Sequence, residues 1–438
     1  MARKMKDSGI EWIGEIPTDF SLYKLKYLLS SPLCYGANES GTLYSDILPR
    51  YIRITDISPN GTLKNSGMLS LDESSAQNYM LHEGDILFAR SGATVGKSFI
   101  YHNYYGRAAY AGYLIKASFN RLVLPEFVYY YTCSSAYEIW KNSIFIQSTI
   151  QNIGADRYSN LPISVPNSID KQLRIVRYLN NFCSKFDAII YNLQTSIEDY
   201  KKLKQAVITQ AVTKGVRGER EMKDSGVEWI GEIPAEWSIT KIKSGVTKIG
   251  SGKTPSGGAE TYTDSGVIFL RSQNIYDCTL NLESPTYISP EVDATMKSTR
   301  VLPDDVLLNI TGGSIGRCSI VPKTLGLANV NQHVCIIRTN PLIFLPKYMQ
   351  YFWVSTLGHL AIDLYQTGGN REGMSADAIR NTPIPYAPLN EQKEIADYLD
   401  AKCAEIDKLI AKKEQLVKEL ESYKKSLIYE VVTGKREV

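Results

Sequence analysis

Several segments of this chain are dense in side chains that grip phosphates or pair with the edges of nucleic-acid bases. Lys and Arg would neutralise phosphates, while amide, hydroxyl and guanidinium groups would hydrogen-bond to bases. In the first half the candidates are Arg90, Ser91, Thr94, Lys97, Tyr104, Tyr105, Arg107, Gln147, Ser148 and Thr149. In the second half they are Lys253, Thr254, Arg271, Ser272, Gln273, Asn274, Thr311, Ser314, Arg317, Asn331, Gln332, Gln366, Thr367, Asn370 and Arg371.

Other chemistries have weaker support in the sequence. The segment from Ser91 to Ser98 resembles a phosphate-binding loop, but Ser91 occupies the position of the first glycine. No G-x-G-x-x-G opens a helix after a strand, no adenine-methyltransferase motif is present, and the four histidines are scattered without H-E-x-x-H. We therefore expect a chain that has no active site of its own and binds no metal or cofactor.

Composition limits the remaining classes. The 438 residues are 43% hydrophobic, enough for more than one core, yet no apolar run approaches the ~18 residues of a membrane helix. The seven cysteines contain no C-x-x-C pair, and the basic N-terminus has no apolar stretch behind it. These features favour a cytoplasmic protein. A net charge of +3 neither requires nor excludes nucleic acid.

The chain repeats itself. Residues 5–17 read MKDSGIEWIGEIP and residues 222–234 read MKDSGVEWIGEIP, identical at 12 of 13 positions. Residues 81–97 align more loosely with 301–317, and residues 171–180 with 391–400. The chain is therefore a tandem duplication of a unit of about 220 residues, too long for a solenoid repeat.

Each unit begins with a body of mixed pattern. Residues 51–57, 85–90, 267–271, 305–310 and 333–339 read as strands. Residues 124–140 and 345–362 each read as one helix that starts just after a proline. The expected fold class is mixed α/β (α+β) in two copies.

Long segments almost free of Gly and Pro follow these bodies. In the first, one heptad row is Leu179, Phe186, Leu193, Tyr200 and Val207, with Phe182, Ile189 and Leu203 as the companion row. In the second, one row is Leu399, Ile406, Leu420 and Leu427, broken by Lys413, with Leu409, Leu416 and Tyr423 as companions. This pattern predicts two long helices that form an antiparallel coiled coil, with pseudo-twofold symmetry and the bodies at opposite ends. Each helix packing on its own body is the alternative.

In combination these motifs resemble the specificity subunit of type I restriction-modification systems. The resemblance rests on the repeated MKDSG-[IV]-EWIGEIP, on LPISVPNSIDKQ (161–172) and TPIPYAPLNEQ (382–392) leading into the helices, and on VTKG (212–215) and VVTGK (431–435) near the helix ends. One departure is that Asp170, Lys171 and Gln172 stand where the second copy has Asn390, Glu391 and Gln392.

The resemblance implies two target-recognition domains, each reading half of an asymmetric, bipartite site in double-stranded DNA, with the paired helices fixing the gap. It also implies two methyltransferase subunits carrying S-adenosylmethionine, and restriction subunits using ATP and Mg²⁺. The expected boundaries are 1–166 and 216–387 for the recognition domains, and 167–215 and 388–438 for the helices. Separate partners and a fused restriction-methyltransferase partner stay open, as does a protein–protein scaffold without DNA specificity.

Overall fold

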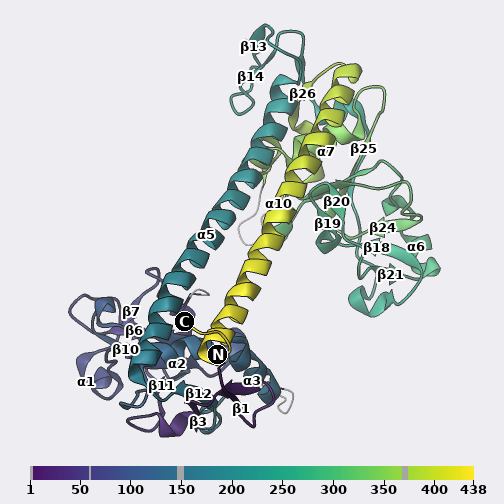
Figure 1. The fold of residues 1–438 in the computed structure, drawn as a ribbon. Helices are drawn as coiled ribbons and strands as arrows, with labels where there is room; N and C mark the ends of the chain where they lie inside the picture. The colour runs from purple at the N-terminus through teal and green to yellow at the C-terminus, as the bar shows by residue number, and fades with distance from the viewer. Residues whose placement is uncertain (1–2, 59–60, 146–151, 367–372) are drawn as a thin grey trace. The chain divides into compact units, whose positions relative to one another are not determined.

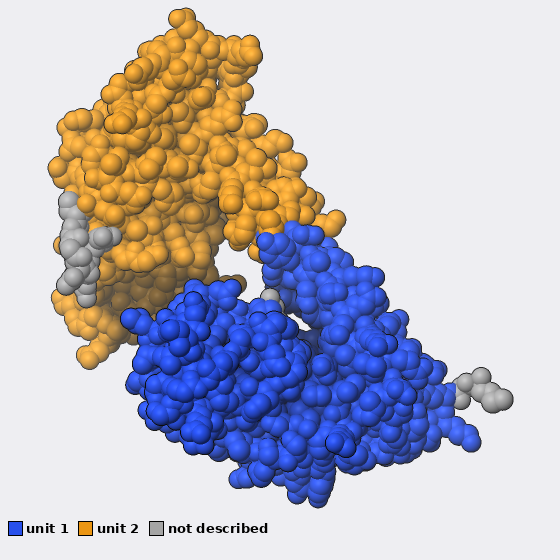
Figure 2. All heavy atoms as spheres, turned by 90° about the vertical axis from the view of Figure 1, so that its left-hand side faces the viewer, with its two compact units in different colours: residues 1–194, 415–438 blue, residues 195–414 orange. Residues whose placement is uncertain are grey.

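The chain is described from a computed structural model that covers residues 3–58, 61–145, 152–366 and 373–438. It divides into two compact units, coloured separately in Figure 2. Unit 1 comprises Met1–Gln194 and Gln415–Val438, and unit 2 comprises Thr195–Glu414. Both units contain parts of the same two long helices, labelled α5 and α10 in Figure 1.

The body of unit 1 is built from short strands and helices. Its strands are β1 (Met5–Asp7), β2 (Glu15–Pro17), β3 (Phe20–Lys24), β4 (Cys34–Tyr35), β5 (Thr42–Leu43), β6 (Arg50–Ile52), β7 (Leu69–Ser70), β8 (Ile86–Ala89), β9 (Ser98–Ile100), β10 (Ala108–Tyr110), β11 (Leu114–Ala117) and β12 (Pro162–Pro166). Its helices are α1 (Glu73–Ala76), α2 (Pro125–Thr132), α3 (Ser135–Phe145) and α4 (Ala155–Ser159), followed by the long α5 (Ile169–Lys214).

Unit 2 repeats this plan. Its strands are β13 (Met222–Asp224), β14 (Glu232–Pro234), β15 (Ser238–Lys241), β16 (Val246–Ser251), β17 (Tyr262–Thr263), β18 (Val267–Leu270), β19 (Ile275–Tyr276), β20 (Thr279–Leu280), β21 (Thr286–Ile288), β22 (Val306–Asn309), β23 (Cys318–Ile320), β24 (Ala328–Val330), β25 (Val334–Thr339) and β26 (Pro383–Tyr386). Its helices are α6 (Pro290–Thr295), α7 (Pro346–Val354), α8 (Thr356–Tyr365) and α9 (Ala376–Asn381), followed by the long α10 (Leu389–Val432).

Two four-stranded sheets form the centre of each body. In unit 1 their strand orders are β4-β11-β8-β9 and β10-β6-β7-β5, and in unit 2 they are β16-β25-β22-β23 and β17-β21-β18-β24. The first sheet is antiparallel in both units, and the second contains one parallel pair, β10 with β6 or β24 with β18. The mixed α/β class predicted from the sequence is confirmed, and the repeat extends to sheet topology.

The segment predicted as one helix after each proline is two helices in each unit. In unit 2 α7 ends at Val354, and Ser355 begins α8 by accepting a hydrogen bond from Gly358 N at 3.3 Å. A Cβ on Gly358 would come within 2.3 Å of the carbonyl oxygen of Trp353, so the turn is too tight for a side chain. Unit 1 breaks likewise between α2 and α3. The single-helix prediction was wrong because apolar periodicity continues across this serine-capped break.

The two long helices pack against each other in antiparallel orientation, as predicted (Figure 1). In unit 2, Lys204 forms an ion pair with Asp407 at 2.7 Å, and Lys413 lies 5.6 Å from the ring of Tyr200. Unit 1 repeats the first contact with Lys424 and Asp187 at 2.6 Å. No helix within the described residues is long and apolar enough to cross a membrane.

The companion row of each heptad pattern was wrong by one residue. Ile189 and Leu203 on α5 are both 48% exposed, whereas Ile190 and Ile197 are buried. On α10, Leu409, Leu416 and Tyr423 are 37–52% exposed, and the row one residue later lies inward. That inner row contains Cys403, Ile410, Val417 and Lys424 on α10, and Cys183, Ile190, Ile197 and Lys204 on α5. Cysteine and lysine made the true row look less apolar than its neighbour, since spacings of three and four residues both fit a heptad.

One glutamine fastens the start of each long helix to its body. The side chain of Gln392 is fully buried: it accepts a hydrogen bond from Leu345 N at 2.9 Å and donates to the carbonyls of Ile343 and Ala387, each at 2.9 Å. Gln172 makes the equivalent three bonds at 2.8–3.0 Å. The glutamine of each entry motif therefore satisfies backbone groups where the helix leaves the body.

The residue before this glutamine explains the sequence departure between the copies. Glu391 is fully buried, accepts a hydrogen bond from the indole N–H of Trp237 at 2.9 Å, and forms an ion pair with Arg220 at 2.6 Å. Lys171 instead forms an ion pair with Asp19 and lies 5.2 Å from the ring of Phe20. Equivalent positions of the two repeats thus carry opposite charges: Lys171 pairs with Asp19, and Glu391 pairs with Arg220.

Candidate nucleic-acid interface

Four strand ends of unit 2 meet around the short connection between β24 and β25. Asn331 N donates to Leu270 O at the end of β18, and Ile310 N, just after β22, donates to His333 O, both at 3.0 Å. Gly252 N, after β16, donates to Val334 O, also at 3.0 Å. Loops of four strands therefore converge at one place where the two sheets join. We name the residues 252–254, 271–274, 309–317 and 331–333 the unit 2 loop cluster.

Unit 1 has the same frame around the connection between β10 and β11. Ala111 N donates to Ile52 O at 3.0 Å, Arg90 N to Tyr113 O at 3.1 Å, and Gly36 N to Leu114 O at 3.2 Å. A Cβ on Gly36 would lie within 2.5 Å of the backbone of Tyr110 and Ala111, and Gly252 is confined in the same way by Val330 and Asn331. We name residues 35–38, 90–97 and 111–113 the unit 1 loop cluster. The frames match, but the side chains that they carry differ.

A hydrogen-bonded chain of side chains crosses the unit 2 loop cluster. The hydroxyl of Thr254 donates to Gln332 Oε1, and Gln332 Nε2 lies 3.0 Å from His333 Nε2. His333 Nδ1 lies 2.6 Å from the hydroxyl of Thr311. Gln332 and Thr254 are exposed, while His333 and Thr311 are half-buried. Three of the sequence-predicted residues are therefore brought together, and a histidine joins them.

A second polar junction links two further predicted segments. The buried amide of Asn309 donates to the carbonyl of Ser272 at 2.8 Å and to the hydroxyl of Ser314 at 3.1 Å. The guanidinium of Arg317 lies 4.6 Å from the centre of the Tyr276 ring. This junction positions the Gly312–Ser314 turn beside the loop after β18.

Arg271 and its unit 1 counterpart Arg53 differ in their partners. The Arg53 guanidinium binds both carboxylate oxygens of Asp56, at 2.8 and 3.1 Å. At the position of Asp56, unit 2 has Asn274, whose Oδ1 accepts from the backbone N of Arg271 at 2.9 Å and whose Nδ2 donates to the carbonyl of Asn281 at 3.0 Å. The guanidinium of Arg271 lies 5.7 Å from the Tyr262 ring, and its Nε has no partner among the described residues. Among the described residues no carboxylate pairs with Arg271, whereas Asp56 neutralises Arg53.

The remaining unit 2 candidates fall into two groups. Asn274 and Asn331 are buried, and their side chains hold backbone groups of their own loops, which gives both a structural role. Lys253 and Gln273 are exposed in the loop cluster, Lys253 following strand β16. Gln366 is half-buried at the end of α8, outside the cluster as we define it.

In unit 1, Arg90 is the centre of the cluster. Its guanidinium lies 4.8 Å from the Tyr35 ring, and its backbone binds Tyr113, which is 63% exposed. Ser91 begins the turn Gly92–Thr94, and Lys97 follows it, half-buried. A cation packed on a tyrosine ring, with an exposed tyrosine in the neighbouring connection, can contact phosphates and stack on bases.

Tyr104, Tyr105 and Arg107 lie in the connection between β9 and β10. Tyr104 is 76% exposed, whereas Tyr105 packs on Phe99 in the core, and burial raises its pKa to about 12. Arg107 forms an ion pair with Glu73 on the surface. Of these three, Tyr104 is the side chain left most accessible.

Six predicted residues lie outside the described part of the chain, namely Gln147, Ser148, Thr149, Thr367, Asn370 and Arg371. The cluster residues missing from the sequence-based set include Tyr35, Tyr113 and the buried Asn309. Tyr113 stands at the position that His333 occupies in unit 2, so a finer alignment of the repeats would have found it. Tyr35 gave no signal, because its proximity to Arg90 arises only from the fold.

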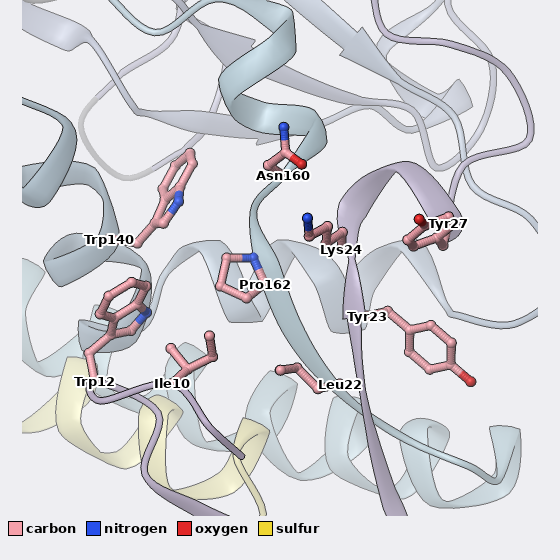
Figure 3. A pocket seen from close by; sticks show the side chains of 9 residues that line it. All are labelled: Ile10, Trp12, Leu22, Tyr23, Lys24, Tyr27, Trp140, Asn160 and Pro162. Carbon is pink, nitrogen blue, oxygen red and sulfur yellow. The ribbon is translucent and has the colours of Figure 1, made fainter.

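An open hollow of about 420 Å³ lies in unit 1 and is lined by other elements. Trp12 and Trp140 stand on one side of Pro162, and Tyr23 and Tyr27 on the other (Figure 3). The indole N–H of Trp12 has no partner among the described residues. None of these residues belongs to the unit 1 loop cluster.

Comparison with known proteins defines the class. The family described as "Type I restriction modification DNA specificity domain" matches residues 44–199 and again residues 234–419. The putative type I restriction enzyme MjaX specificity subunit of Methanocaldococcus jannaschii is 26% identical, over 97% of this chain and 95% of the relative. The MjaVIII specificity subunit of the same organism is 24% identical, over 81% and 80%. A solved structure described as "Structural basis underlying complex assembly and conformational transition of the type I R-M system" shares the fold, with a TM-score of 0.71 at 15% identity, covering 96% of this chain and 99% of that one.

The duplicated mixed α/β body with two paired helices is therefore the architecture of a restriction-modification specificity protein. The chain belongs to the type I restriction-modification DNA specificity family, and its function is that of a specificity subunit.

Proposed function

We propose that this chain is the DNA-reading, non-catalytic subunit of a complex that methylates and cuts DNA. Each unit reads one half of an asymmetric bipartite site through its loop cluster. The paired helices set the number of unread base pairs between the halves. The observation that carries this proposal is the pair of loop clusters, in which equal backbone frames hold different side chains.

The loop clusters support DNA reading through their chemistry. Lys253, Arg271 and Arg317 supply cations for phosphates in unit 2, and Arg90 and Lys97 do so in unit 1. Amides and hydroxyls beside them can reach base edges, and each good bidentate pair discriminates by about 1–3 kcal/mol. Different side chains on one frame would give two different half-sites.

Exposed apolar side chains on the long helices support a partner on that face. Ile189 and Leu203 on α5, and Leu409, Leu416 and Tyr423 on α10, continue a heptad row that points away from the helix pair. Unpaired apolar rows of this kind mark contact surfaces. We assign them to two methyltransferase subunits, the partners that the family resemblance implies.

The cofactors belong to those partners in this proposal. The methyltransferase subunits bring S-adenosylmethionine, and the restriction subunits, separate or fused to them, bring ATP and Mg²⁺. The complex works in the cytoplasm, where chromosomal DNA lies.

Co-expression with a type I methyltransferase subunit from the same genome tests the proposal. We expect the two proteins to copurify and N6-methyladenine to appear in a single bipartite motif with a fixed gap. Replacing residues 1–166 by the equivalent part of a relative should then change one half of that motif and leave the other. Copurification with no sequence preference for DNA would favour a protein scaffold, and failure to copurify would remove the assigned partner.

A further inference from the structure

The side chain of Gln332 is held at both ends of its amide group. The Thr254 hydroxyl donates to Oε1, and Nε2 donates to His333 Nε2, 3.0 Å away. In this tautomer His333 carries its proton on Nδ1 and donates it to the Thr311 hydroxyl at 2.6 Å. Rotating the amide by 180° would set Oε1 against the unprotonated Nε2 of His333. This opposes two acceptors, unless the ring moves its proton to Nε2 and the Thr311 hydroxyl donates to Nδ1 instead. The network therefore holds the amide in place at both ends and couples its orientation to the tautomer of His333.

The amide retains one free hydrogen-bonding position at each end. An Oε1 atom has two lone pairs and Nε2 has two protons, and the network uses one of each. Gln332 is exposed on the loop cluster. It therefore retains an acceptor and a donor for any molecule that covers the cluster.

Only one base presents the complementary pair in the major groove. Adenine offers an N6 donor beside an N7 acceptor, which Gln contacts through two hydrogen bonds. Guanine offers two acceptors, cytosine a donor alone, and thymine an acceptor beside a methyl group. Against guanine, which offers two acceptors, the amide oxygen would meet an acceptor in either orientation of the amide.

The same position in unit 1 carries no reader. Gly112 replaces Gln332 there, and a Cβ on Gly112 would lie 1.9 Å from Oδ1 of Asn38, the counterpart of Thr254. Tyr113 stands at the position of His333. The two units share the backbone arrangement, but the glutamine held by Thr254 and His333 is present in unit 2 and not at the equivalent position of unit 1.

We propose that Gln332 reads an adenine in the half-site of unit 2, and that Thr254 and His333 are positioning residues that orient its amide. This assignment rests on the proposed function, because it requires unit 2 to bind DNA through its loop cluster. It deepens that function by naming one base and the side chain that selects it.

The test compares variants of the full chain copurified with its methyltransferase partner. Both the methylated motif in cells and the DNA selected by the purified complex from a random pool are sequenced, so that the readout does not depend on catalysis alone. In Gln332→Ala one A·T position of the unit 2 half-site should become degenerate, losing roughly 5- to 150-fold discrimination. The unit 1 half-site, identified by exchange of residues 1–166, should stay unchanged.

A matched pair of variants tests the positioning role. Thr254→Val removes the hydroxyl and should weaken the preference for adenine at the same position, because one end of the amide is no longer held, whereas Thr254→Ser should keep the wild-type preference. Both residues are exposed, so equal melting temperatures of all variants serve as the folding control.

Three outcomes would overturn the assignment. Uniformly weaker binding of all sequences by Gln332→Ala would show that Gln332 contacts the DNA backbone and not a base. An unchanged motif would show that Gln332 has no role in sequence recognition. A change at a G·C position would assign it to another base. If the wild-type complex selects no bipartite sequence, the proposed function itself fails and the adenine assignment falls with it.

Discussion

Arg53 and Arg271 show how one position can serve the fold in one repeat and remain free in the other. Asp56, which is 3% exposed, neutralises Arg53, whereas Asn274 stands in its place beside Arg271, and no carboxylate of the part of the chain that the structure describes pairs with that guanidinium. A charged side chain that is already paired contributes little to DNA binding, because its partner must first be displaced. The arginine without a counter-charge is the one that can contact a phosphate or a guanine.

Removing these two arginines should therefore have opposite signatures. Arg271→Ala should weaken DNA binding and reduce the slope of log affinity against log salt concentration by about 0.9, the value of one phosphate contact. Arg53→Ala should leave the slope unchanged and lower the melting temperature, because it leaves Asp56 buried without its partner. Binding titrations at several salt concentrations, with melting curves, distinguish the two. Equal slope changes would contradict the structural reading of Arg53.

In the long helices, the heptad pattern predicts the helices themselves but does not decide which residues form the second row of the seam. The existence of both helices and one row of each seam follow from heptad spacing, but the second row could be placed three or four residues further on. Ile189 and Ile190 illustrate the ambiguity, since they are neighbours of identical chemistry, 48% and 9% exposed. Which row faces the other helix depends on the positions of Cys183, Lys204 and their counterparts on α10. Hydrophobicity does not identify these residues as part of the inner row.

These two isoleucines form a matched pair for experiment. Ile190→Ala should lower the free energy of unfolding by about 2–5 kcal/mol, the usual range for a truncated core isoleucine. Ile189→Ala should change stability by less than about 1 kcal/mol and should instead weaken copurification with the methyltransferase partner. Denaturant unfolding and pull-down of both variants test this. Equal destabilisation would mean that the inner row is assigned incorrectly.

The junction of helix and body depends on the buried glutamines. Gln392→Ala would leave the N–H of Leu345 and two carbonyl groups without partners in the interior. We expect a loss of at least about 2 kcal/mol in the stability of unit 2. Asn390→Ala, at an exposed position of the same helix within unit 2, is the control and should stay within about 0.5 kcal/mol. Urea unfolding followed by the fluorescence of Trp237, a residue of unit 2, would report the change.

At the scale of the whole molecule, duplication could be read from the sequence but the sites could not. Identity at 12 of 13 positions revealed two copies. The convergence of loops on the β24–β25 connection required the pairing of strands distant in the sequence, such as Ser251 with Cys335 and Asn309 with Val334. Polar residues are common in loops, so residue type alone made Asn274 and Gln332 equal candidates for DNA contact, although Asn274 is buried and Gln332 is exposed.

The helices offer a test of the proposed spacing role. Inserting one heptad between Gln194 and Thr195, and another between Glu414 and Gln415, keeps the seam in phase. Seven residues lengthen a helix by about 10 Å, which is about three base-pair steps at ~3.4 Å each. We expect the unread gap to change by about three base pairs while both half-sites stay the same. Methylome sequencing checks this, and an unchanged gap would exclude the helices as the spacer.

The opposite charges of Lys171 and Glu391 have a consequence for how the two repeats stay distinct. The hairpins 5–17 and 222–234 are nearly identical, so each could dock on the wrong helix during folding, or be exchanged by recombination within the gene. If residues 5–20 took the place of residues 222–237, Phe20 would replace Trp237, and the buried carboxylate of Glu391 would lose its indole donor. In the reverse exchange, Trp237 would lie beside Lys171, and its N–H would be buried without an acceptor. Each mismatch costs about 1–3 kcal/mol. The pairs Phe20 with Lys171 and Trp237 with Glu391 thus favour the docking of each hairpin on its own unit.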